Sequence, residues 1–103
     1  MDRTAAQLMA RELMDQHGLT TWSFRFDRAR RRAGACIHSR QEITLSRALV
    51  ALYDEQTVRG VILHEIAHAL VGATHKHDAV WQAKARELGS PDSARLPGGL
   101  PTP

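Results

Sequence analysis

The feature that most constrains this chain is an apolar segment that holds two histidines and a glutamate. Between Asp54 and Gly72, apolar residues recur at helical spacing and nearly surround the second half of the segment, which predicts a helix buried within the domain. His64, Glu65 and His68 lie in that second half. Because burying these side chains without partners is costly, the segment predicts a group that binds them. The competing interpretation is a chance pattern on an ordinary helix.

The spacing of these three residues favours a zinc ion as that group. His64 and His68 are four residues apart, so both imidazoles project from one face of the helix and can hold a single ion. Zinc binds neutral imidazole nitrogens well. Glu65, one step around the helix, can take a proton from water and return it to a leaving amine. The pattern predicts one Zn²⁺ ion and hydrolysis of peptide bonds, with Glu65 as the catalytic base and acid.

Two histidines do not complete such a site, because catalytic zinc normally takes three protein ligands and one water. The downstream side chains able to supply the third ligand are His75, His77, Asp78 and Glu87. Glu87 stands at a distance along the chain that suits a carboxylate ligand on the next helix, but it also suits a solvated surface residue. The residue types leave this choice open.

The rest of the sequence predicts an α+β fold. A first helix is expected from a cap at Thr4, and Thr21–Asp27 alternates apolar and polar residues as a half-buried strand does. Two short strands near residues 35–38 and 42–45, joined by a polar turn, are expected to form an antiparallel hairpin. Asp78 is expected to cap a last helix.

Length and composition narrow the class further. The 103 residues have room for one domain, expected over residues 1–96, with a flexible Pro/Gly-rich tail at 97–103. Cys36 is the only cysteine, which excludes an internal disulfide and a cysteine-rich zinc ribbon. No apolar run approaches the roughly 20 residues that span a bilayer. We expect a soluble, cytoplasmic monomer with no membrane partner.

Positive charge is concentrated in the first half of the sequence. Residues 1–47 contain nine Arg against five acidic residues, although the net charge of the chain is only +3. An Arg-rich run follows the first predicted strand and could contact phosphates, which makes DNA a candidate partner; the alternative is a charged surface that faces water. The candidate contacts are Arg25, Arg28, Arg30, Arg31 and Arg32.

The stretch from His64 to Trp81 resembles the SprT-like metalloprotease family, which includes the Spartan-type proteases that digest proteins crosslinked to DNA. The family pattern is a helical zinc motif, a loop, and then a His followed four residues later by an aromatic. His77 and Trp81 have this spacing. The resemblance therefore implies that His77 is the third zinc ligand, and that His75 orients a ligand or contacts the substrate. Asp78, besides capping the last helix, is a candidate for orienting a ligating imidazole.

The resemblance extends upstream, over roughly residues 5–89, through segments 22–27, 32–36 and 42–46. It implies a minimal zincin-like domain, with a few helices packed on a short antiparallel three-stranded sheet. It also implies a zinc metalloendopeptidase acting on proteins, including DNA-associated proteins. Many relatives add a cysteine-rich subdomain, which Cys36 alone cannot supply. The alternative is a catalytically weak zinc-containing module of the same fold that binds nucleic acid or protein.

Overall fold

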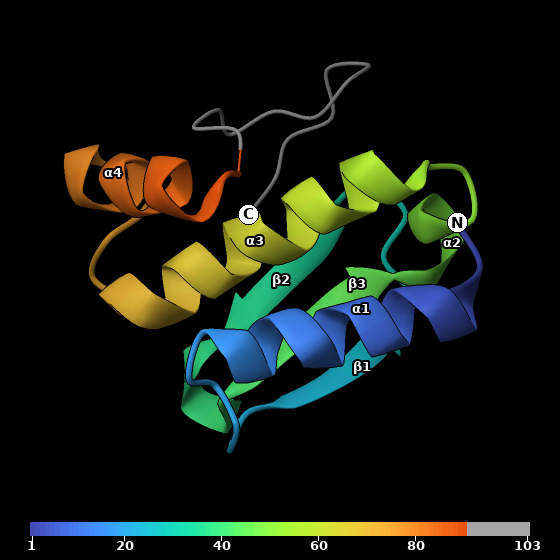
Figure 1. Cartoon of the computed structure of the whole chain (residues 1–103), viewed down its shortest axis with the longest axis horizontal. Helices are drawn as coiled ribbons and strands as arrows, with labels where there is room; N and C mark the ends of the chain where they lie inside the picture. Colours follow the sequence, from blue (N-terminus) through green and yellow to red (C-terminus); the bar gives the residue numbers. More distant parts are fainter. Residues whose placement is uncertain (91–103) are drawn as a thin grey trace.

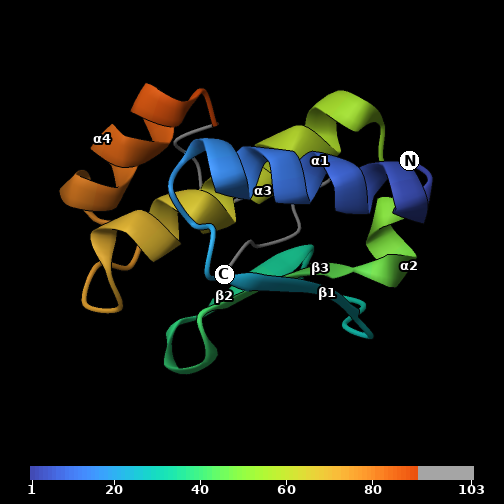
Figure 2. The same ribbon diagram turned by 60° about the horizontal axis from the view of Figure 1, so that its bottom comes forward.

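A three-stranded sheet carries two long helices on one face. The computed structural model describes residues 1–90, and in it α1 and α3 lie side by side on the same face of the sheet, while α4 packs against the C-terminal half of α3 (Figures 1 and 2). The elements are α1 (Arg3–Gln16), β1 (Ser23–Asp27), β2 (Gly34–Ile37), the 3₁₀ turn η1 (His38–Arg40), β3 (Glu42–Ser46), α2 (Arg47–Val50), α3 (Glu55–Val71) and α4 (Ala79–Leu88).

The sheet is mixed, in the order β1-β3-β2. Strands β2 and β3 form the predicted antiparallel hairpin, with Cys36 opposite Ile43. Strand β1 pairs with β3 in parallel, with Phe24 also opposite Ile43. The α+β class is confirmed, whereas the wholly antiparallel sheet is wrong for β1. The cause is that β3, buried from Ile43 to Ser46, takes the centre of the sheet and separates β1 from β2.

Short polar side chains begin the helices. Asp2, not Thr4, caps α1, because its extended backbone lets its carboxylate accept the N–H of Ala5 at 3.0 Å. The cap predicted at Asp78 is confirmed, and Asp54, where the buried helix was expected to begin, caps α3 in the same way; each accepts a hydrogen bond from the N–H group three residues later. These caps set where α3 and α4 begin, and so determine which residues of each helix face the other.

Strand β2 comes unusually close to α3. A Cβ atom at Gly34 would lie 2.8 Å from the carbonyl oxygen of Thr44 and 3.3 Å from Cγ of Glu65. Only glycine fits this approach without displacing backbone. The contact places β2, an edge strand of the described sheet, directly beside the glutamate of the His-Glu-x-x-His segment.

The predicted boundary at residue 96 and the tail at 97–103 lie outside the described residues. Within residues 1–90, no helix is both long and apolar enough to cross a membrane.

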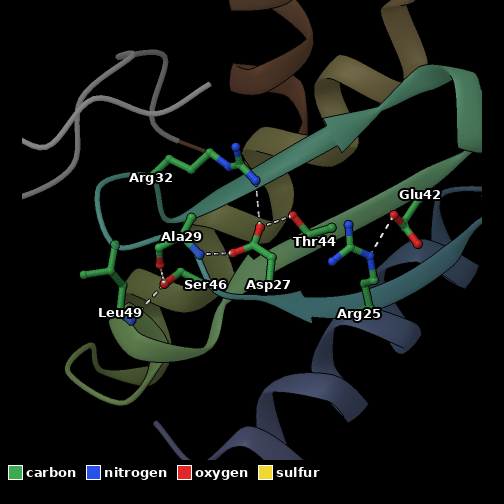
Figure 3. A network of polar contacts seen from close by, with 8 residues as sticks. All are labelled: Arg25, Asp27, Ala29, Arg32, Glu42, Thr44, Ser46 and Leu49. Carbon is green, nitrogen blue, oxygen red and sulfur yellow. Dashed lines mark hydrogen bonds and ion pairs between the residues drawn. The ribbon is translucent and has the colours of Figure 1, made fainter.

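A buried carboxylate ties the end of β1 to β3 and to the loop before β2 (Figure 3). Asp27 is 7% exposed and accepts hydrogen bonds from Thr44 Oγ1 at 2.7 Å, the N–H of Ala29 at 3.0 Å and Arg32 Nη2 at 3.1 Å. Burial alone would raise the pKa of Asp27, but these three donors together lower it below its ordinary value.

This network predicts a pH dependence of folding. A carboxyl whose pKa is lower in the folded than in the unfolded chain stabilises the fold above its unfolded pKa of about 4, and this contribution disappears as pH falls through the folded value. The free energy of unfolding of the metal-free protein should therefore fall more steeply below about pH 4 than that of Asp27→Asn. Urea denaturation at several pH values measures both slopes, and equal slopes would contradict the prediction.

Candidate metal centre

Three imidazoles from different parts of the chain meet at one point. His64 and His68 come from successive turns of α3, and His77 comes from the loop that precedes α4. The Nε2 atom of His77 lies 3.1 Å from Nε2 of His64 and 3.1 Å from Nε2 of His68. His64 and His68 are buried and His77 is partly buried. The structure therefore brings together the two helical histidines and the one that the family resemblance singled out.

The geometry of these nitrogens fits a metal ion. Two imidazole nitrogens bound to one tetrahedral zinc at about 2.0–2.1 Å would lie about 3.3 Å apart, close to the distances between His77 and its two neighbours. A neutral imidazole carries one N–H, so Nε2 of His77 cannot donate to both neighbours at once. A shared cation, by contrast, can accept a lone pair from all three rings.

Glu65 lies beside this cluster without a hydrogen-bond partner. Its side chain is fully buried, neither carboxylate oxygen has a partner within residues 1–90, and Oε2 is 4.0 Å from Nε2 of His64. Burial raises the pKa of Glu65 well above its ordinary value, and the positive charge of Arg32 offsets only part of that rise. A buried carboxyl without a hydrogen-bond partner among the described residues is costly for folding, and such groups are more common at functional sites than elsewhere.

Trp81 forms one wall of the cluster. It is fully buried, and its ring centroid lies 4.6 Å from that of His64, 5.2 Å from His68 and 4.6 Å from His77. Its Nε1 donates to the carbonyl oxygen of His64 at 3.4 Å. The interpretation of Trp81 as a packing residue between the last two helices agrees with these contacts, which also restrict the orientation of all three imidazoles.

The other candidates for the third ligand lie elsewhere. Nδ1 of His75 lies 2.7 Å from Oδ2 of Asp78, whose other oxygen accepts the N–H of Trp81. The hydrogen bonds from Trp81 and His75 lower the pKa of Asp78. Glu87 is exposed on α4 and forms an ion pair with Lys84 at 2.9 Å. The metal-binding cluster found among the described residues contains neither acid nor His75.

The five candidate arginines do not form one free basic surface. Arg25 pairs with Glu42 at 3.0 Å, and Arg32 pairs with Asp27 at 3.1 Å (Figure 3). The other three are exposed, and no ion pair within residues 1–90 involves them; they are Arg28, Arg30 and Arg31. The group available for anions is therefore smaller than the sequence indicates.

Cys36 is not poised as a nucleophile. Burial raises the pKa of the Cys36 thiol to about 12, and the charge of Glu65 acts in the same direction. Its Sγ lies 3.7 Å from Nε2 of His38. A thiol with this pKa stays protonated at neutral pH, and Cys36 is only partly buried in β2.

The sequence analysis missed Gln82, whose Nε2 donates to the carbonyl oxygen of His77 at 3.0 Å. Its position in the helix could have indicated this contact. Gln82 is the fourth residue of the helix that Asp78 caps, and a side chain at that position can reach back to the residue before the cap.

Two histidines and a buried glutamate on the central helix α3, joined by a third histidine from the loop before α4, are the arrangement of a zincin-like domain. Comparison with protein families matches residues 3–98, nearly the whole chain, to the SprT-like family. The chain belongs to the SprT-like family. Comparison with curated proteins gives no match.

Proposed function

We propose that this protein is a zinc-dependent metalloendopeptidase that hydrolyses protein substrates. The observation that carries the proposal is the meeting of three imidazoles beside Glu65, whose buried carboxylate has no hydrogen-bond partner in the described part of the chain. Membership of the SprT-like family supports the same chemistry.

In this proposal His64, His68 and His77 hold the zinc ion. When bound, zinc would supply a Lewis acid that polarises a peptide carbonyl and makes water more acidic. Glu65 takes the proton of the attacking water on its carboxylate and delivers it to the nitrogen of the leaving amine. Burial raises the pKa of Glu65 in the metal-free protein, so its carboxylate accepts a proton more readily than that of an exposed glutamate.

The surrounding residues position the substrate and these groups. Trp81 closes the cluster on the side of α4 and fixes the three rings. Strand β2 lies at an edge of the described sheet and passes Glu65 at Gly34. An extended peptide could pair with that edge through main-chain hydrogen bonds, which would place its carbonyl groups near Glu65.

Metal analysis and a cleavage assay test the proposal. The purified protein should contain one zinc per chain and cleave an unfolded protein such as casein. His77→Ala should weaken zinc binding by more than about 100-fold, since loss of a ligand should exceed the 10–100-fold cost of losing a ligand's hydrogen-bond partner. Glu87→Ala is the matched control, because Glu87 is an exposed carboxylate on the adjacent helix. The ligand assignment is wrong if Glu87→Ala, and not His77→Ala, loses zinc.

The second candidate is a zinc-containing module that binds nucleic acid or protein without hydrolysis. It is favoured by the exposed residues Arg28, Arg30 and Arg31 at one end of the sheet. If zinc-loaded protein cleaves nothing, with or without single-stranded or duplex DNA, this candidate replaces the peptidase. If cleavage appears only with DNA, the substrates are DNA-associated proteins, in line with repair of DNA-protein crosslinks.

A further inference from the structure

His77 has a backbone conformation that few residues of its type adopt. Its φ is +55°, in the left-handed region, and within residues 1–90 only Gln41 shares a positive φ among residues other than glycine. Side chains disfavour this region, although histidine enters it more often than most residues. Something in the surrounding structure must therefore hold His77 there.

The N-terminus of α4 supplies the restraint. Asp78 is the cap of α4, so His77 is the residue before the cap and Gln82 is the fourth residue of the helix. These two positions lie next to each other in space at helix starts, where they commonly make an apolar contact. Here the contact is a hydrogen bond instead, from Gln82 Nε2 to the carbonyl oxygen of His77 at 3.0 Å.

We propose that Gln82 is a positioning residue for the third metal ligand: its amide holds the main chain of His77 in the left-handed conformation that turns the imidazole toward His64 and His68. His64 and His68 need no such device, because α3 sets their backbone. His77 lies outside any helix or strand, so its backbone conformation is not set by regular secondary structure. Trp81 contacts the ring, and Gln82 restrains the backbone behind it.

The inference rests on the proposed metal site but not on peptidase activity. It predicts that Gln82→Met, which keeps the length of the side chain and removes the donor, weakens zinc binding by about 10–100-fold, the usual cost of losing a partner that orients a ligand. Gln82→Ala should weaken zinc binding by the same factor. It should leave α4 intact, because alanine has the highest helix propensity. Gln56→Met, at an exposed glutamine in the first turn of α3, should bind zinc as the wild type does.

The experiment titrates zinc into the full chain against a chromophoric chelator, with circular dichroism to confirm folding of every variant. The visible absorption of the cobalt(II)-loaded proteins reports the ligands of the metal, which a purely structural role of Gln82 would leave unchanged. In Gln82→Met and Gln82→Ala this absorption should be weaker than in the wild type, as water replaces the His77 ring. Wild-type zinc affinity in both variants, or an equal loss in Gln56→Met, would overturn the role of Gln82 and leave the proposed function standing. A wild-type chain that binds no zinc would overturn the proposed function as well.

Discussion

Replacing Glu65 with glutamine is expected to lower the rate of peptide hydrolysis by about 10²–10⁴, the range that a positioned acid or base contributes. Zinc binding should be retained, because Glu65 is not among the three side chains whose nitrogen atoms converge. Cleavage of an unfolded protein and zinc content, measured on the same preparation, check both parts. Glu87→Gln, at an exposed position, is the control and should leave both unchanged.

The same substitution should stabilise the metal-free protein. The pKa of Glu65 is raised by burial, which means that the folded chain disfavours its ionised form, and this penalty grows as pH rises above the ordinary pKa of a glutamate. Glutamine is neutral at every pH, so Glu65→Gln should melt at a higher temperature than the wild type at neutral pH and show a smaller difference at pH 4. A variant that retains activity, or that is destabilised at neutral pH, would contradict this account of Glu65.

Replacing Trp81 with alanine is expected to lower the free energy of unfolding by about 3–5 kcal/mol, the usual cost of removing a buried aromatic. Trp81 is fully buried and forms an apolar cluster with Ala67 and Ala85 between α3 and α4. The large void would also free the imidazoles that pack on the ring. Urea denaturation of the metal-free protein measures the loss of stability, and zinc titration measures the loss of affinity.

Two neighbouring variants separate these effects. Trp81→Phe keeps an aromatic ring among the histidines, although it loses the hydrogen bond to the carbonyl of His64 and part of the buried volume, so it should lose less stability than Trp81→Ala. Val80→Ala alters an exposed side chain next to Trp81 and should change stability by less than about 0.5 kcal/mol. If Trp81→Ala weakened zinc binding no more than Val80→Ala does, Trp81 would have no role in orienting the ligands.

Local patterns explain most of what could be predicted. The common face of His64 and His68 follows from helical periodicity, and the caps at Asp54 and Asp78 follow from side chains that bond their own backbone three residues on. The apolar and polar alternation that predicted β1 is likewise a local pattern. Each of these features depends on residues close together in the chain, so the sequence displays them directly.

Long-range packing decided the remaining features. The alternation of apolar and polar residues in β1 is the same whether the strand pairs in parallel or antiparallel. The sequence pattern therefore could not predict that β1 pairs with β3 in parallel. The residue types and spacing left four candidates for the third ligand, among them His77 and Glu87, and the family resemblance favoured His77. In the structure, Glu87 is exposed on α4 and forms an ion pair with Lys84 of the same helix. Packing also divided the apparent run of five arginines, since Arg25 of β1 pairs with Glu42 of the neighbouring strand β3.

The sequence by itself determined that a buried helix would present two imidazoles and a carboxylate, because helix geometry repeats every few residues. Only the tertiary structure decided that His77 meets them and that Trp81 packs against them. Those contacts join the start of α4 to α3 across a loop, and their geometry depends on how the two helices pack.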